Sequence, residues 1–209
     1  MLEHKIDFMV TIEVREANAN GDPLSGNMPR TDAKGHGLIS DVAIKRKIRN
    51  RMQDFGCPTF VQAGDRIEDE FRSLEKRFSN QFTSKDSDAE IEEKANHLWM
   101  DVRSFGQVFT YLKKSIGVRG PVSLNMAKSL APIVISSLQI TRSTNGMEAK
   151  NESGRSSDTM GTKHFVDYDV YVIKGSINPN FAEKTGFSDE DAEVIKKALM
   201  SLFENDASS

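Results

Sequence analysis

Two segments in the last third of the chain are rich in the β-branched and aromatic residues that favour strands: 133–143, IVISSLQITRS, and 164–176, HFVDYDVYVIKGS. The residues between them, 144–163, are polar or small, apart from a methionine near each end. A connection of this length is far longer than an ordinary β-hairpin turn. The pattern therefore predicts a long hairpin over 133–174 whose tip, at about 144–163, projects from the body of the protein.

A strand is also predicted near the start of the chain. Apolar and polar residues alternate from 5 to 15, which is typical of a strand with one buried face. The segment that follows, 17–37, contains glycines, prolines and asparagines throughout and cannot form a regular ladder or helix. Because long ordered loops are often functional, this Gly-rich loop is a candidate binding segment.

A basic helix is predicted at 41–53. Ser40 or Asp41 can cap its first turn, and apolar residues then recur every four positions. The helix carries several lysines and arginines. Lys45 and Arg49 lie one helical turn apart, so they project from a common face.

Three further regions complete the prediction. Residues 65–103 are acidic and have helical periodicity, whereas 104–132 contain several glycines and prolines and are expected to be irregular. The segment 187–206 is a predicted helix in which Ser188 and Asp191 offer a capping box.

The order of these elements predicts an α+β fold. Strand, helix, two strands and helix are five of the six parts of the ferredoxin-like unit, which is also the RNA-recognition fold. We expect a modified ferredoxin-like domain over 1–64 and 104–209, with 65–103 as an inserted helical subdomain. The sixth part, a last strand, would follow the helix that ends near 205 and is expected to be missing by truncation.

Composition excludes several classes of protein. The single cysteine rules out a disulfide framework or a thiolate zinc site, and the four histidines show no ligand spacing, so no metal or cofactor is expected. No apolar run is long enough to span a membrane, and the N-terminus lacks signal-peptide features, which favours the cytoplasm. The net charge is −3, yet 102–181 holds more bases than acids, and this local excess can favour a polyanion.

Five blocks of sequence resemble the backbone subunit of the type I-C Cascade, the Cas-seven family of the RAMP superfamily. Together they extend over almost the whole chain: NGDPLSGNMPR at 20–30, GLISDVAIKRKIR at 37–49, DVRSFGQVF at 101–109, GVRGPVS at 117–123 and TGFSDED at 185–191. The resemblance implies a ferredoxin-like palm, finger insertions and a thumb-like hairpin. It also implies that copies stack head to tail along one CRISPR RNA, among the other Cascade subunits, and present it to target DNA without performing chemistry. The long tip at 144–163 is then the thumb candidate, and 65–103 the finger candidate.

A protein that holds any spacer sequence must grip phosphates and leave base edges free to pair. The predicted RNA-binding residues are therefore cations of the basic helix, the Gly-rich loop, a Gly-rich turn and the hairpin, together with two methionines that could wedge between bases. They are Arg30, Lys34, Lys45, Arg46, Arg49, Arg119, Arg142, Met147 and Met160.

Two alternatives stay open. In the first, the chain is a RAMP-type endoribonuclease that uses His36 as a general base, or a loop aspartate, Asp22 or Asp32. In the second, it is a general single-stranded RNA-binding protein that binds as a monomer and does not form an array. Lone histidines and aspartates in polar loops are usually turn formers, which weakens the first alternative.

Overall fold

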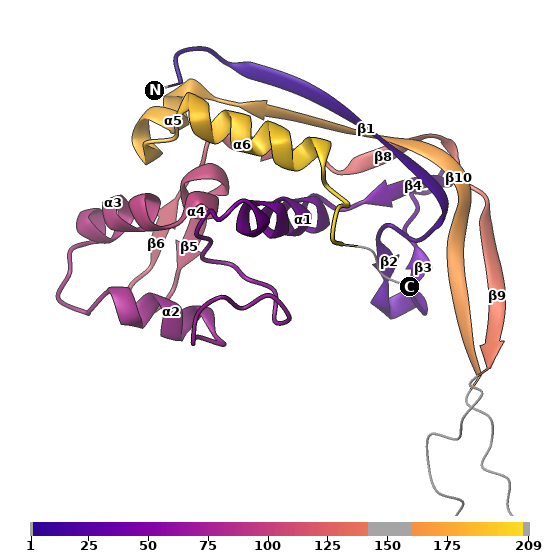
Figure 1. Cartoon of the computed structure of the whole chain (residues 1–209), viewed down its shortest axis with the longest axis horizontal. Helices are drawn as coiled ribbons and strands as arrows, with labels where there is room; N and C mark the ends of the chain where they lie inside the picture. Colours follow the sequence, from indigo (N-terminus) through magenta and orange to yellow (C-terminus); the bar gives the residue numbers. More distant parts are fainter. Residues whose placement is uncertain (1, 142–159, 207–209) are drawn as a thin grey trace, which may run out of the picture. The chain divides into compact units, whose positions relative to one another are not determined.

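The protein is described by a computed structural model that covers residues 2–141 and 160–206 (Figure 1). The predicted contacts Arg142 and Met147 lie outside the described residues. The chain divides into two compact units, which are treated separately below. The first comprises Met1–Val10, Ser40–Met126 and Ile173–Ser209, and the second comprises Thr11–Ile39 and Ala127–Val172.

Two long strands, β1 (Ile6–Ala17) and β10 (Met160–Ile177), belong in part to each unit. The main sheet has the strand order β1-β10-β8-β4, and β7 and β9 also pair with β10. All the strand pairs whose register is described are antiparallel. The sequence prediction of a mixed fold of helices and strands is confirmed, whereas its finer ferredoxin-like assignment stays a prediction.

In the second unit, β10 pairs with β9 (Ile135–Thr141) in a ladder that runs from Val166 opposite Ile135 to Met160 opposite Thr141 (Figure 1). The predicted pairing of the two β-rich segments is therefore confirmed. The expected tip is too long at one end, because residues 160–163 are paired as strand. Gly161, Thr162 and Lys163 include no large apolar residue that would have marked this stretch as strand in the sequence.

The second unit also contains short strands that the sequence did not predict. β8 (Ala127–Pro132) pairs with β4 (His36–Ile39), and Ser129 of β8 lies opposite Tyr171 of β10. In the Gly-rich loop, β2 (Gly21–Asp22) pairs with β3 (Met28–Pro29) around the 3-10 turn Pro23–Ser25. The expectation of an irregular loop was wrong at these positions.

In the first unit, α1 (Asp41–Asp54) begins at Ser40, whose side chain accepts a hydrogen bond from the Ala43 amide. The expected apolar stripe is fully buried: Ile44, Ile48 and Met52. The helix packs against α6.

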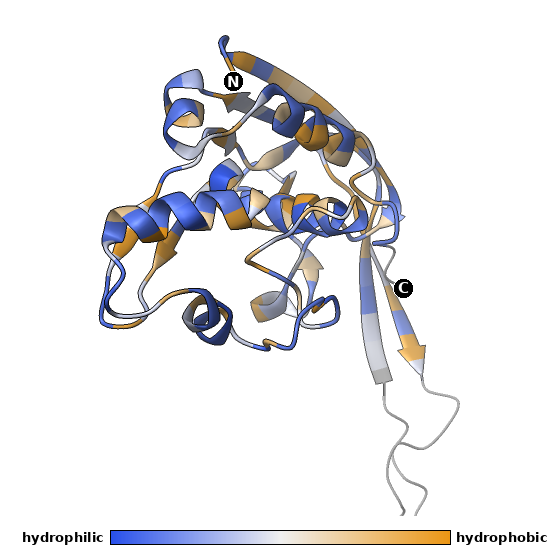
Figure 2. Ribbon diagram, turned by 60° about the vertical axis from the view of Figure 1, so that its left-hand side comes forward, coloured by the Kyte–Doolittle hydropathy of each residue, from blue (hydrophilic) through white to orange (hydrophobic). Residues whose placement is uncertain are grey.

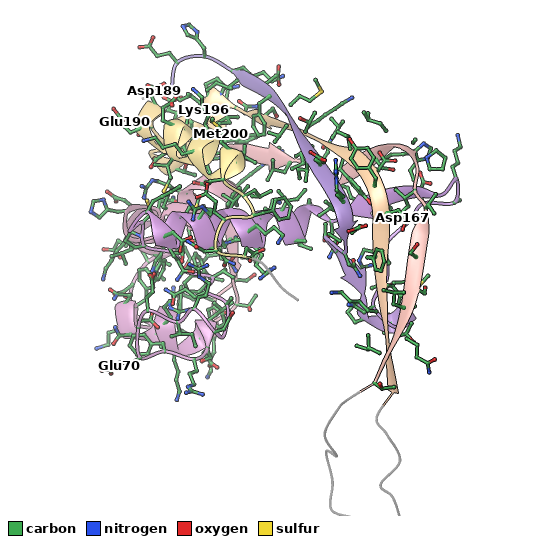
Figure 3. All side chains as sticks on the ribbon, turned by 45° about the vertical axis from the view of Figure 1, so that its right-hand side comes forward. Glu70, Asp167, Asp189, Glu190, Lys196 and Met200 are labelled. Carbon is green, nitrogen blue, oxygen red and sulfur yellow. The ribbon has the colours of Figure 1, made fainter. Side chains whose placement is uncertain are left out.

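α6 (Asp189–Met200) follows the shorter α5 (Pro179–Thr185), and its predicted capping box between Ser188 and Asp191 is confirmed. Ile195 and Leu199 are buried on the inner side of α6. Lys196 and Met200 of the same helix are exposed to solvent, and Figure 3 marks their places. In Figure 2, hydrophilic residues (blue) and hydrophobic residues (orange) follow one another along the helices, as expected when one side of a helix is buried and the other is exposed.

The rest of the first unit is a helical region with an aromatic core. Its helices are α2 (Leu74–Gln81), α3 (Asp88–Leu98) and α4 (Met100–Phe105), and the strands β5 (Gln107–Phe109) and β6 (Ile116–Val118) form a hairpin beside them (Figure 1). Five aromatic side chains make up the centre of the core: Phe60, Phe78, Phe82, Trp99 and Phe109.

The boundaries 65–103 for this insertion stay a prediction, although the core extends before and after them. Residues 65–73, which the sequence predicted to be helical, are irregular. The first helix of this region begins only after Ser73, whose side chain accepts a hydrogen bond from the Lys76 amide. The expected irregularity of 104–132 was also wrong, since β5, β6, β7 (Val122–Leu124) and β8 all lie there. These strands are too short for a periodic pattern to identify them.

Candidate nucleic-acid interface

The three predicted phosphate contacts on α1 are each matched by a carboxylate. Lys45 Nζ lies 3.3 Å from Asp41 Oδ2, one turn earlier on the same helix. Arg46 Nη1 lies 3.9 Å from Asp206 Oδ1, and its side chain is 53% exposed. The Arg46 guanidinium is therefore the most open of these three groups to an external phosphate.

Arg49, a predicted phosphate contact, is held by two neighbours within the first unit. Its Nε donates to Asp101 Oδ2 at 2.8 Å, and its guanidinium lies over the ring of Phe105. Asp101 is fully buried and also accepts the backbone amides of Phe60 and Val61, at 2.7 and 3.1 Å. Arg49 thus connects α1 to the helical region, and a role in RNA binding stays a prediction for it.

Two further cations of α1, Lys47 and Arg51, are buried. The Lys47 ammonium contacts the Asp206 carboxylate, and Arg51 pairs with Asp54 at 2.6 Å and with Glu204 at 3.1 Å. The basic character of α1 is therefore largely compensated within the first unit. Asp206 and Glu204 lie 159 and 153 positions from Lys47 and Arg51, so these two pairs could not be assigned from spacing alone.

The Gly-rich loop of the second unit presents Arg30 and Lys34 differently. Arg30 Nη2 lies 3.4 Å from Asp22 Oδ1, while its Nε is buried and finds no hydrogen-bond partner among the described residues. Lys34 is exposed, and its backbone amide donates to Asp32 Oδ1 at 2.8 Å. Both cations are accessible from this loop, as a phosphate contact requires.

Asp32 organises this loop. Its carboxylate accepts the backbone amide of His36 at 3.0 Å as well as that of Lys34, and it pairs with Lys128 Nζ of β8 at 2.6 Å. The hydrogen bond from Lys128, and then the two amides, hold the pKa of Asp32 well below its usual value. A carboxylate of such low basicity is a poor proton acceptor, which weakens its candidacy as a general base.

Lys128 is a candidate that sequence reasoning missed. Its side chain is 49% exposed beside Asp32, and β8 alternates buried Ala127 and Ser129 with exposed Lys128 and Leu130. This short alternation was the available signal, but neighbouring prolines and glycines obscured it.

Arg119 lies in the first unit, directly after β6. Its side chain is exposed, and its guanidinium lies 4.2 Å from the ring centroid of Phe181. A flat guanidinium stacked on an aromatic ring keeps its N–H edges free to donate. The predicted role of Arg119 as a phosphate contact is compatible with this arrangement.

The hairpin contributes apolar side chains to the second unit. Leu138 and Ile140 of β9 lie on one face of the ladder and are 56% and 53% exposed. Met160, a predicted wedge, pairs with Thr141 through its backbone, and its side chain is outside the described residues. The wedge role of Met160 stays a prediction.

Over the described ranges, no group of three histidine, cysteine, aspartate or glutamate side chains could hold a metal ion. None of the helices in the same ranges combines the length and hydropathy that a membrane span requires.

Antiparallel strands, a long two-stranded ribbon and exposed cations define a mixed α/β protein with features suited to a polyanion. The family model of CRISPR-associated protein Cas7 matches residues 4–209. The chain therefore belongs to the Cas7 family.

A curated relative in Haloferax volcanii, also a CRISPR-associated protein Cas7, is 24% identical, with 99% of this chain aligned. This chain spans about two thirds of that protein, 66% of its length.

Two solved structures share the fold. One is a chain of a CRISPR RNA-guided surveillance complex, pre-nicking, with a TM-score of 0.58 and 14% identity over 96% of this chain and 72% of that chain. The other is a chain of a CRISPR RNA-guided surveillance complex, with a TM-score of 0.53 and 16% identity over 96% of this chain and 60% of that chain.

Proposed function

We propose that this protein is the repeating backbone subunit of a type I CRISPR surveillance complex, or Cascade. It coats the spacer of the CRISPR RNA without regard to sequence and presents it to target DNA. The family match over residues 4–209 is the observation that carries this proposal. The solved chains of surveillance complexes that share its fold support it further. The finer assignment to type I-C rests on the sequence blocks described above.

The exposed cations suit this function. Arg46 and Arg119 belong to the first unit, and Lys34 and Lys128 to the second. Arginine and lysine bind phosphate oxygens, which are the same in every nucleotide, so this grip does not discriminate between sequences. Base edges then stay free to pair with target DNA.

The β9–β10 hairpin is the proposed thumb, and the helical region around the aromatic core is the proposed finger insertion. Exposed apolar side chains such as Leu138 and Ile140 are costly to leave in water, and they suit contact with a neighbouring copy or with an unstacked base. Copies stacked head to tail would cover them.

The function proposed here is binding without chemistry. Asp22 accepts the Leu24 amide at 3.2 Å and lies beside Arg30, and Asp32 is committed to two amides and Lys128, so both serve the loop structure. Incubation with repeat RNA, with and without Mg²⁺, tests this directly. Intact RNA is the expected result, and specific cleavage that His36→Ala, Asp22→Ala or Asp32→Ala abolishes would establish the endoribonuclease alternative.

A titration with RNAs of increasing length distinguishes the array from a single-RNA binder. Light scattering of the purified complexes should give a number of protein copies that rises in steps with RNA length. A constant single copy on every RNA would support the general RNA-binding alternative instead. Scrambled spacers should bind equally well, since only phosphates are gripped.

A further inference from the structure

Three groups of α1 converge on one carboxylate in the first unit. The Lys47 ammonium contacts Asp206, Asn50 Nδ2 donates to Asp206 Oδ1 at 3.2 Å, and Arg46 Nη1 lies 3.9 Å from the same oxygen. Lys47 is only 6% exposed and Asn50 only 4%. Asp206 is thus held by a lysine and an amide that are both more than nine-tenths buried.

This arrangement has the chemistry of an anion site. A buried ammonium requires an anionic partner, because an unpaired charge away from water is costly. Two charged donors and one neutral amide donor are also what a phosphate needs, since its oxygens accept several charge-assisted hydrogen bonds at once. Arg46 and Asn50 are one helical turn apart, and Lys47 lies next to them, so the three share one side of α1.

The segment that supplies Asp206 is held mainly by charge. After α6 the chain continues in turns, and Asn205 has a left-handed backbone with φ of 54°, a conformation that asparagine tolerates and that ends the helical path. Phe203 lies under the Lys47 ammonium but is 39% exposed, and Glu204, which pairs with Arg51, is 68% exposed. The last buried apolar side chain before this segment is Leu202, two residues after the end of α6.

An external polyanion can therefore replace these contacts without disturbing the packed part of α6. We propose that Lys47, Asn50 and Arg46 form a phosphate-binding site for the RNA backbone, and that Asp206 occupies this site in the free protein as an internal substitute for phosphate. The site rests on the proposed function, which supplies the RNA. When RNA binds, a phosphate takes the place of the Asp206 carboxylate, and the segment 203–206 moves away from α1.

The test compares full-chain variants in RNA binding at several salt concentrations, with a labelled single-stranded RNA of unrelated sequence. Asp206→Asn removes the competing carboxylate and should raise affinity about three- to tenfold at an unchanged salt slope, because the same phosphate contact forms in the complexes of both proteins. Lys47→Gln should lower affinity, and Asp206→Asn should no longer raise it when Lys47→Gln is present. Lys47→Arg keeps the charge and should keep the affinity.

Glu193→Gln is the matched control. It makes the same change in net charge and also frees a lysine, because Glu193 pairs with Lys196 at 3.4 Å on the exposed side of α6. If Asp206→Asn has no larger effect than Glu193→Gln, the inference is wrong. Equal affinity of Lys47→Gln and wild type would also overturn it, provided that urea unfolding shows the variant to be folded.

A second readout separates this inference from the proposed function. Thermal unfolding is followed with inorganic phosphate as the probe, and Asp206→Asn should gain a phosphate-dependent rise in Tm that the variant carrying both Asp206→Asn and Lys47→Gln lacks. If that rise is present but no array forms on RNA, the anion site stands and the proposed function fails. If the wild-type array forms and the rise is absent, the proposed function stands and the site is refuted.

Discussion

Asp101 offers a quantitative test of how α1 is joined to the helical region. Its buried carboxylate makes three hydrogen bonds, to the Arg49 guanidinium and to the amides of Phe60 and Val61. Asp101→Ala would leave a guanidinium that is only 14% exposed without its counter-ion, and two amides without their acceptor. Removing one partner of a buried ion pair costs about 3–5 kcal/mol. We expect a loss of about 4 kcal/mol, a large part of the ~5–15 kcal/mol that stabilises a typical domain.

The assay is urea unfolding at pH 7, followed by the fluorescence of Trp99. This is the single tryptophan of the chain, and its ring centroid lies 4.7 Å from that of Phe60, next to the bond that is lost. Asp65→Ala, which removes an exposed aspartate of the same region, is the control and should change stability by less than about 0.5 kcal/mol. A loss below about 1 kcal/mol for Asp101→Ala would show that these three bonds do not hold the region together.

Burial, and then the nearby charge of Asp169, raise the pKa of Tyr171 to about 12. The neutral phenol of Tyr171 therefore favours folding, and this contribution is complete below the usual pKa of about 10 and declines as the pH rises toward 12; a tyrosinate absorbance titration should show a late component that Tyr171→Phe removes, and a titration left unchanged by that substitution would contradict the raised pKa of Tyr171. Gly37→Ala should destabilise the protein by about 1–3 kcal/mol in urea unfolding, because its Cβ would clash with the hydroxyl of buried Tyr171; an unchanged midpoint would contradict the tight packing. Arg46→Ala and Arg119→Ala should each reduce the salt slope of RNA binding by about 0.7 and weaken all spacer sequences equally; a loss confined to some sequences would argue for base readout.

Elements with a local pattern were predictable from the sequence. Alternation identified β1, and capping residues together with a four-residue apolar repeat identified α1 and α6. β4 and β8 were not predictable in this way. Each is short, and each becomes a strand through pairing with a segment about 90 positions away, as the hydrogen bond from the Gly37 amide to Ser129 illustrates.

The candidate site was predictable only in part. The sequence identified which residues are basic, but it could not show which carboxylates face them. Asp206 is 159 positions from Lys47, and Asp101 is 52 positions from Arg49. Such pairs depend on tertiary packing, so the sequence overestimated the free charge of α1 and overlooked Lys128, whose exposure follows from β8.

Nuclease protection tests the central proposal most directly. The protein is purified together with a CRISPR RNA, the complex is digested with a nonspecific ribonuclease, and the protected fragments are sized. A backbone subunit that stacks along the guide should give a ladder of fragments whose lengths differ by one constant increment. A single short footprint, unchanged on longer guides, would contradict the proposal that this protein forms a repeating array on RNA.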